Sequence, residues 1–337
     1  MQQDPQLRAP SGRAYKRTSN TTLRILIVTN MYPTIERPEF GIFVREQVEA
    51  LRDLPGLTVD VWPFAGGGLH YLRAAAQLKA HLRQHSYDVI HAHYGLSGWT
   101  TKLAKRRTPM LVTFHGTDVH HPLVGQLSKV LGKVVELAAV VSPSLSHTLK
   151  RVPDRNVPVF VLPTGVDMAR FQPLPKRDSR DRLGISSDRK YLLFPADPSR
   201  VVKRYDRAQA LVDRLEGVEL LVMQGVPADD VPLWINAADA VLVTSEYEGF
   251  GLAICEALAC NVPVLSTPVG IAPLVLSSLD GTHCAPFEVD DWTTALQCCL
   301  KNDDFRVLGR QRAQFFDRRR MAERVLCAYR EIAATAA

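Results

Sequence analysis

Two glutamates lie eight positions apart in the stretch EGFGLAICE, where Glu248 and Glu256 frame a Gly-Phe-Gly segment. An apolar run at 240–245, typical of a buried strand, precedes the stretch, and helical spacing of apolar residues begins at Leu252. The segment 249–251 is therefore predicted at a helix N-terminus, where unpaired N–H groups and the helix dipole bind anions. Glycines at this point let a phosphate approach the backbone closely.

A carboxylate beside an anion site suits a ligand that carries hydroxyl groups next to its phosphates. An ionised glutamate only accepts hydrogen bonds, so it can hold sugar hydroxyls. The plainer interpretation makes Glu248 a favourable first-turn acid and Glu256 a solvated helix residue. Spacing alone leaves both interpretations open.

The elements that would position these residues follow from an alternation of short apolar runs and helical segments. The runs are typical of strands buried on both faces, while 44–54 and 72–84 have helical period. Repeated alternation of this kind predicts a parallel sheet covered by helices. The runs are RILIVT (24–29), VDVWP (59–63), DVIHAH (88–93), MLVTFH (110–115), AAVVSP (138–143), VFVLP (159–163), YLLFPA (191–196), VELLVM (218–223), AVLVTS (240–245) and VPVLST (262–267).

The chain is expected to form two domains. Its 337 residues are more than a single hydrophobic core usually accommodates. A stretch rich in Pro, Ser and charged residues at 172–190 also interrupts the alternation of strands and helices. We therefore predict an α/β protein with two Rossmann-like, doubly wound parallel-sheet domains and a cleft between them, with ligands at the carboxyl ends of the strands. The predicted divisions are a disordered basic tail at 1–22, a first domain at 23–175, a linker at 176–187, a second domain at 188–318 and a C-terminal helix at 319–337.

Composition narrows the function classes. The chain has a net charge of +6, but its basic residues are dispersed and no basic stripe is interleaved with aromatic residues, which disfavours a nucleic-acid binder. The six cysteines lie in the last quarter of the chain without a Cys-x-x-Cys pair, a pattern typical of reduced thiols in a cytoplasmic protein. No segment approaches the roughly 20 apolar residues of a membrane span.

The segment 1–22 carries four basic residues and one acidic residue without periodicity, and we expect it to be disordered. Such a tail permits peripheral contact with anionic lipid on the inner face of the cell membrane, worth about 1 kcal/mol per well-placed basic residue. A start-site artefact without function is the equally weighted alternative.

The signature Glu-Gly-Phe-Gly-(x)4-Glu, followed by ALACNVPVLSTPVG, closely resembles that of the retaining nucleotide-sugar glycosyltransferases of the GT-B fold, the family 4-like proteins of group 1. The resemblance implies that Glu248 contacts the donor sugar and Glu256 the ribose of the nucleotide. It also implies that the last helix crosses back onto the first domain. The diphosphate would face the amides of Gly249, Phe250, Gly251 and Leu252.

Other segments carry the same resemblance. NAADAVLVTS (236–245) is similar to the run before the signature, and PTGVD (163–167) to the segment that closes the first domain, with Thr164 at the usual Asn position. TFHGTD resembles the loop whose histidine faces the reacting sugar, which makes His115 the candidate, with a structural strand-end histidine as the alternative. GIFVREQVEAL resembles the turn near the acceptor and the donor phosphates, which implies a role for Gly41.

The basic loop after the second domain's first strand departs from the family pattern. The family places an arginine six residues before a lysine, and FPADPSRVVKR has Lys203 at the lysine position but Asp197 at the arginine position. Arg200 and Arg204 are the nearby substitutes. Two cations suit a diphosphate leaving group, because negative charge grows on it as the glycosidic bond breaks. Solvated surface residues remain the alternative for Lys203 and Arg200.

His91 and His93 have the spacing of two residues on one strand face and could share a metal ion, but no third ligand with suitable spacing is evident. Histidines at a strand end are more often structural residues. We therefore expect no metal, and no cofactor beyond the donor substrate. No Gly-x-Ser-x-Gly elbow, P-loop or Gly-x-Gly-x-x-Gly follows any predicted strand.

The sequence thus predicts a retaining glycosyltransferase that moves a sugar from a UDP- or GDP-sugar to a hydroxyl of a glycan, a glycolipid or a small molecule, in polysaccharide or glycoconjugate biosynthesis. In this interpretation Glu248, His115 and Lys203 act in catalysis, and no divalent metal takes part. Two alternatives remain. One is a nucleotide-sugar epimerase of the same fold, and the other is a non-catalytic sugar-nucleotide-binding subunit, which Asp197 favours.

Overall fold

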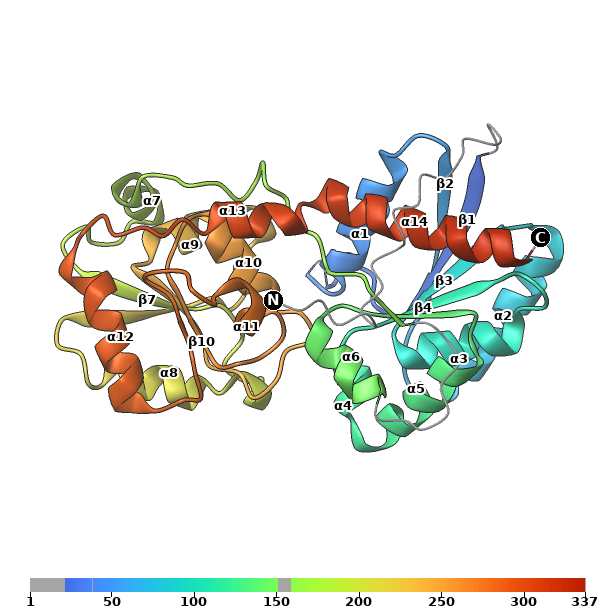
Figure 1. Cartoon of the computed structure of the whole chain (residues 1–337), viewed down its shortest axis with the longest axis horizontal. Helices are drawn as coiled ribbons and strands as arrows, with labels where there is room; N and C mark the ends of the chain where they lie inside the picture. The colour runs from blue at the N-terminus through green and yellow to red at the C-terminus, as the bar shows by residue number, and fades with distance from the viewer. Residues whose placement is uncertain (1–21, 38, 151–158, 337) are drawn as a thin grey trace. The chain divides into compact units, whose positions relative to one another are not determined.

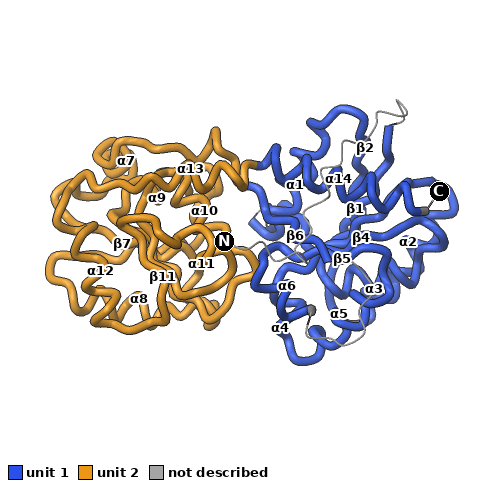
Figure 2. Tube along the Cα trace, in the orientation of Figure 1, with its two compact units in different colours: residues 1–165, 318–337 blue, residues 166–317 orange. Residues whose placement is uncertain are grey.

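The computed structural model describes residues 22–37, 39–150 and 159–336 (Figure 1). The tail predicted at 1–22 lies, except for its last residue, outside the described residues. The chain divides into two compact units (Figure 2). Unit 1 comprises residues 1–165 and 318–337, and unit 2 comprises residues 166–317.

Unit 1 contains a six-stranded parallel sheet in the order β2-β1-β3-β4-β5-β6. The order reverses direction between β1 and β3, which makes the carboxyl ends of these strands the topological switch point. The strands are β1 (Leu23–Thr29), β2 (Leu57–Pro63), β3 (Val89–His93), β4 (Met110–Phe114), β5 (Leu137–Val140) and β6 (Val159–Val161). The helices are α1 (Ile42–Arg52), α2 (His70–Gln84), α3 (Gly95–Ala104), α4 (Thr117–His120), α5 (Pro122–Val134), α6 (Pro143–Lys150) and α14 (Arg318–Ala336).

Helices cover both faces of this sheet (Figure 1). Alternate residues of β1 point to opposite sides. Ile25 belongs to a core cluster with α1 and α14. Leu26 belongs to a second cluster, with Leu78 of α2 and Ala104 of α3. Burial on both faces explains why the strands read as continuous apolar runs and confirms the predicted class of parallel α/β sheet.

The polar residue His91 is fully buried in the middle of this sheet, on β3. Its Nδ1 lies 2.7 Å from Tyr329 Oη on α14, and its Nε2 lies 2.8 Å from Thr113 Oγ1 on β4. Burial lowers the pKa of His91 to about 3, so the ring is neutral. With both ring nitrogens bonded, His91 ties α14 to the sheet.

Unit 2 contains a five-stranded parallel sheet in the order β11-β10-β9-β7-β8, with its switch point between β7 and β9. The strands are β7 (Lys190–Phe194), β8 (Val218–Val222), β9 (Ala240–Val243), β10 (Val264–Ser266) and β11 (His283–Cys284). The α-helices are α7 (Lys176–Leu183), α8 (Tyr205–Val212), α9 (Val231–Ala237), α10 (Leu252–Ala259), α11 (Ala272–Val275), α12 (Val289–Lys301) and α13 (Arg310–Ala313). Three short 3-10 helices are η1 (Val201–Lys203), η2 (Ala228–Asp230) and η3 (Gln314–Phe316).

The segment 176–187, expected as a linker, is instead largely helix α7 inside unit 2. Two of its charged residues are buried because they share one carboxylate. Lys176 Nζ lies 2.5 Å from Asp239 Oδ1, and Arg180 Nη2 lies 2.9 Å from Asp239 Oδ2. The main-chain N–H of Tyr191 also donates to Asp239, at 2.7 Å. Charges that are typical of a solvated linker thus form an internal cluster.

The division between the units also falls earlier than the predicted residue 175. Residues 166–171 pack within unit 2, where Arg310 donates to the carbonyl oxygens of Met168 and Phe171, each at 2.6 Å. The sequence pattern placed the domain boundary where the apolar alternation stops. The compact units instead divide after residue 165, and the bonds from the Arg310 side chain hold Met168 and Phe171 in unit 2.

We expect Asp239→Asn to lower the free energy of unfolding by about 3–5 kcal/mol, because two buried cations lose their counter-charge. Chemical denaturation at neutral pH measures the loss. Asp303→Asn is the matched control, since Asp303 is 95% exposed and pairs with Lys190 at the surface, where an ion pair contributes little. Equal stability of the two variants would contradict the structural role of the buried cluster.

Candidate active site

Lys203 and Glu248 meet at the switch point of the unit 2 sheet. Lys203 ends η1, in the connection after β7, and Glu248 lies in the connection after the neighbouring strand β9. Lys203 Nζ is 2.6 Å from Glu248 Oε1, and the two side chains are 16% and 14% exposed. The hydroxyl of Ser245 also donates to Glu248 Oε1, at 2.7 Å. The structure therefore brings together two residues that the sequence singled out separately.

Hydrogen bonds to main-chain carbonyl oxygens link the two connections and hold this pair in place. The N–H of Glu246 donates to the carbonyl oxygen of Val202 at 2.9 Å. Thr244 Oγ1 donates to the carbonyl oxygens of Lys203 and Arg204, at 2.9 and 3.0 Å. The position of each side chain is thus set by the backbone as well as by the ion pair.

The glycine-containing segment leads into α10 as expected. Gly251 adopts a left-handed conformation (φ 94°) immediately before Leu252, the first residue of α10. A side chain is strained at this φ, which explains the glycine. Gly249 directly follows Glu248 in the chain and precedes Phe250.

Phe250 serves the site through its position in the core. The residue is 5% exposed, and its ring centroid lies 5.6 Å from that of Phe316. Its carbonyl oxygen accepts the N–H of Ile271 at 2.9 Å, and a Cβ on Gly270 would lie 2.1 Å from that oxygen. Gly270, which the sequence interpretation did not single out, therefore permits the close packing that fixes the start of α10.

Glu256 lies on α10, where its side chain is partly buried. Its charge adds to the effect of burial in raising the pKa of the neighbouring thiols Cys255 and Cys260, which are therefore protonated at neutral pH.

The basic loop after β7 contains both arginines named as substitutes. Asp197 accepts the N–H of Ser199 at 2.8 Å, a bond that lowers the pKa of its carboxyl. Arg204 is engaged by two carboxylates, Asp206 at 2.7 Å and Glu246 at 2.8 Å. Arg200 is exposed, and its side chain makes no ion pair with the described residues.

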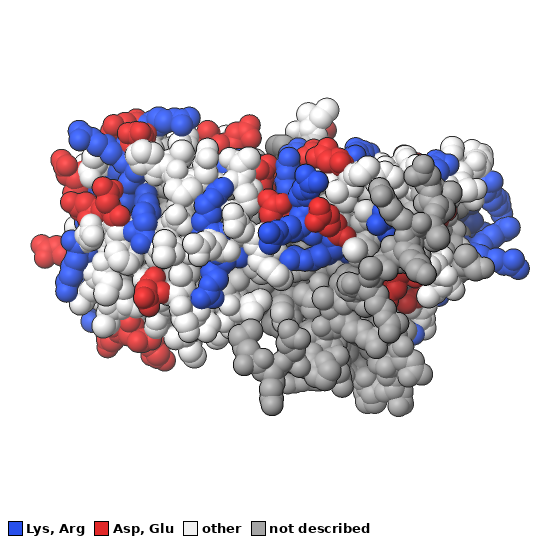
Figure 3. Space-filling model, turned by 45° about the horizontal axis from the view of Figure 1, so that its top comes forward, with Lys and Arg blue, Asp and Glu red and all other residues white. Residues whose placement is uncertain are grey.

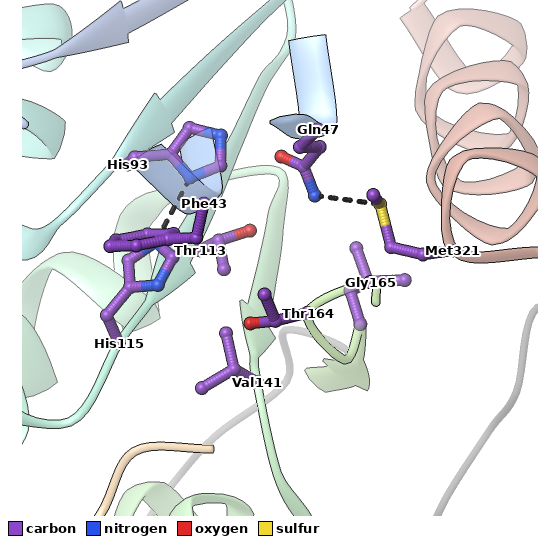
Figure 4. A pocket seen from close by; sticks show the side chains of 10 residues that line it. Phe43, Gln47, His93, Thr113, His115, Val141, Thr164, Gly165 and Met321 are labelled. Atoms are coloured by element: carbon purple, nitrogen blue, oxygen red, sulfur yellow. Dashed lines mark hydrogen bonds between the residues drawn. The ribbon is translucent and has the colours of Figure 1, made fainter. Parts of the chain in front are cut away.

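In unit 1, His115 follows β4 and lines a small pocket (Figure 4). Its Nε2 lies 3.0 Å from Nδ1 of His93, the last residue of β3, and the two rings stack with centroids 5.2 Å apart. The ring of Phe43 of α1 also lies against His115, with a centroid distance of 4.9 Å. The pocket is lined by Phe43, Gln47, His93, Thr113, His115, Val141, Leu162, Thr164, Gly165 and Met321.

The histidine pair is neutral at physiological pH. Burial lowers the pKa of His115 to about 3, and burial together with the neighbouring His91 and His115 holds the pKa of His93 well below its usual value. His93 Nε2 is buried and has no hydrogen-bond partner among the described residues. The sequence interpretation considered His93 only as a metal ligand or a structural residue, and its contact with His115 is new.

Asp118 is a buried carboxylate that the sequence interpretation missed. It accepts the main-chain N–H groups of His115, Gly116 and Gly95, at 3.0, 2.9 and 3.0 Å. Burial raises its pKa to about 6 against the lowering effect of these bonds. The Asp three residues after His115 in TFHGTD was the available signal, because an Asp side chain can bond neighbouring backbone groups of the same loop. Asp118 fixes the loop that presents His115.

Gly41 precedes α1 in a left-handed conformation (φ 72°), and a Cβ there would lie 2.4 Å from the carbonyl oxygen of Met31. The residue therefore allows the connection after β1 to fold tightly against itself at the carboxyl edge of the sheet. Its expected role beside phosphates stays a prediction.

The described residues contain no group of three or more His, Cys, Asp or Glu side chains arranged to hold a metal ion. Within the same part of the chain, no helix is both long enough and apolar enough to cross a membrane.

Comparison with known proteins gives two family matches. The profile of Glycosyltransferase Family 4 matches residues 24–170, and that of Glycosyl transferases group 1 matches residues 202–314. D-inositol 3-phosphate glycosyltransferase of Xylanimonas cellulosilytica is 28% identical over 307 residues, which cover 76% of this chain and 71% of that protein.

Solved structures share the fold at low sequence identity. Sucrose-phosphate synthase from Thermosynechococcus elongatus superposes with a TM-score of 0.79 at 19% identity, covering 93% of this chain and 99% of that one. Anabaena HepE in complex with UDP and glucose superposes with a TM-score of 0.70 at 16% identity, covering 92% and 100%. Together with the two parallel-sheet units and the two family matches, these likenesses show that the chain is a glycosyltransferase of group 1 with the GT-B fold.

Proposed function

We propose that this glycosyltransferase takes its sugar from a nucleoside diphosphate sugar, with UDP or GDP as the leaving group, and transfers it with retention to a hydroxyl of a glycan, a glycolipid or a small molecule. The observation that carries the proposal is the Lys203–Glu248 pair at the switch point of the unit 2 sheet, directly before α10. The structural likeness to a UDP-bound protein supports it.

The pair joins the two kinds of group that such a donor requires. A cation stabilises the negative charge that grows on the diphosphate when the glycosidic bond breaks, and a carboxylate accepts hydrogen bonds from sugar hydroxyls. Ser245 donates to the same oxygen of Glu248 as Lys203, so the carboxylate keeps one hydrogen bond when Lys203 turns toward a phosphate. The amides at 249–252 and the N-terminus of α10 supply further donors to the anion.

Arg200 is the better candidate for the second cation. Arg204 already neutralises Asp206 and Glu246, so moving it to a phosphate would leave two carboxylates without their partner. Arg200 is exposed and could turn without breaking an ion pair among the described residues. Asp197, at the position where the family has arginine, keeps its carboxylate on the N–H of Ser199.

In unit 1, His115 is our candidate for contact with the reacting sugar, and the geometry indicates which of its nitrogens carries a proton. Two neutral imidazoles share one hydrogen bond, so one ring donates and the other accepts. If His115 donated, His93 would carry its proton on Nε2, leaving a buried N–H without an acceptor. We therefore infer that His93 Nδ1 donates to His115 Nε2, which leaves the Nδ1–H of His115 as the donor toward a ligand.

The donor class is tested by thermal unfolding in the presence of UDP and of GDP. A ligand at 100 times its Kd raises the free energy of unfolding by about 2.7 kcal/mol, so the matching nucleotide should raise the Tm by several degrees. No shift with either nucleotide would overturn the donor assignment. Once a donor is found, the anomeric NMR signal of the product distinguishes retention from inversion, and an isomerised donor without acceptor would indicate the epimerase.

Glu248→Gln should lower kcat by about 100- to 1000-fold, because a carboxylate aimed at the reacting sugar is lost. The nucleotide-dependent Tm shift should remain, since the diphosphate contacts lie elsewhere. Steady-state release of nucleoside diphosphate measures the rate. Glu246→Gln is the matched control, two residues away and 53% exposed, and should keep near wild-type kcat. Similar rates in both variants would remove Glu248 from the reaction.

His93→Phe should lower kcat by about tenfold, because His115 loses the donor that fixes its tautomer. A tenfold change in rate corresponds to the free energy of one lost hydrogen bond. His93→Asn places an amide N–H near the Nδ1 position and should restore much of the rate. Steady-state kinetics with the KM for donor reported separately measures both variants. If His93→Asn is as slow as His93→Phe while the two unfold at the same Tm, the hydrogen bond does not act in the reaction.

A further inference from the structure

One surface of unit 1 is unusually apolar. Helix α3 packs between α2 and α5, so the outer sides of the three helices form one surface, named here the α2–α3–α5 face (Figure 1). On α5 the exposed apolar residues follow the spacing i, i+4, i+7, i+11, which places them on one stripe. They are Leu123, Leu127, Val130 and Val134, each 44–75% exposed.

The stripe continues onto the neighbouring helices. Leu72 of α2 and Leu103 of α3 are exposed and line one shallow apolar hollow, together with Trp99. Trp99 Nε1 donates to the carbonyl oxygen of Leu127, which joins this hollow to the α5 stripe. Six of the twelve large exposed hydrophobic residues in the described part of the chain therefore lie on this face.

The charge of the same helices has a single sign. All residues of 70–84, 95–104 and 122–134 are described, and none is Asp or Glu. Six are basic, although the whole chain holds 35 acidic residues against 41 basic ones. On the face of the molecule drawn in Figure 3, by contrast, acidic and basic side chains are interspersed. The basic residues are Arg73, Lys79, Arg83, Lys102, Lys129 and Lys133.

We propose that the α2–α3–α5 face docks on the surface of an anionic lipid bilayer. Exposed leucines beside Lys and Arg, without carboxylates, are the composition of a surface that enters the headgroup region of such a bilayer. A second copy of this chain would bring like charges together. A protein partner is disfavoured because protein interfaces are depleted in lysine, and this face has four.

The docking face adjoins the edge of the sheet that carries the unit 1 pocket. Tyr71 and Leu96, near the starts of α2 and α3, line the hollow. Asn30, which follows β1, donates to Tyr71 Oη at 3.2 Å and accepts from Ser97 Oγ at 2.9 Å. One end of the hollow therefore lies at the carboxyl ends of the strands, the edge at which β3 and β4 present their histidines, and the hollow extends from there along α3 to Leu103. A bilayer on this face would be close to the part of unit 1 that we assign to the reaction.

Flotation of the full chain with vesicles tests the proposal independently of the donor assignment. The wild-type chain should float with vesicles of phosphatidylcholine and phosphatidylglycerol, and far less with phosphatidylcholine alone. The double variant Leu123→Ser/Leu127→Ser should reduce the bound fraction about tenfold, because two apolar side chains no longer enter the headgroup region. Circular dichroism and the Tm show that the variant is folded.

The matched control is Leu274→Ser/Leu308→Ser, since these two leucines of unit 2 are exposed to the same extent, 49% and 74% against 47% and 75%. The control should float like wild type. Three results would overturn the proposal. These are absence of flotation by wild type, equal flotation by the α5 variant, and self-association without lipid that the α5 variant abolishes. The second would assign lipid binding to another part of the chain, and the third would assign the face to a second copy.

Discussion

Both candidate sites depend on one constraint, that every strand in each sheet is parallel to its neighbours. A parallel pair needs a crossover through a helix, so the carboxyl ends of all strands lie at one edge. Residues far apart in the chain can then meet at this edge when they follow adjacent strands. Lys203 and Glu248, 45 positions apart, do so after β7 and β9. His93 and His115, 22 positions apart, do so at β3 and β4.

At each end of strand β9 a partly or fully buried carboxylate pairs with basic side chains. Asp239, directly before the strand, holds two buried cations and a main-chain N–H, and it fixes α7 to the sheet. Glu248, after the strand, holds one cation and one hydroxyl. The first cluster is saturated and therefore structural. The second leaves both partners partly exposed, so a ligand can exchange with one of them while the other stays in place.

The sequence was sufficient to predict the parallel sheets, because burial on both faces produces continuous apolar runs. It also predicted that the glycine segment after β9 leads into a helix, while the roles of Glu248 and Glu256 toward a donor stay proposals. The sequence was insufficient where the burial or role of a residue depends on a partner far away in the chain. Lys176 and Arg180 looked solvated because their counter-charge, Asp239, lies 59 or more positions away. His93 was similarly underestimated, since only the pairing of β3 with β4 brings it to His115. The same pairing brings the N–H of Gly95 to Asp118.

The two helical layers of unit 1 differ in the charge of their outer sides, and packing against the sheet does not explain this difference. Both layers cover the same strands, yet α1 and α14 carry glutamates on their outer sides, whereas α2, α3 and α5 contain none. A helix such as α5 needs only Leu131 and its small neighbours to pack inward, where Gly98 of α3 allows close contact. Its outer leucines and valines add nothing to the core and lower solubility. Their presence beside lysines, in a chain that has many carboxylates elsewhere, is therefore best explained by a partner that is both apolar and anionic.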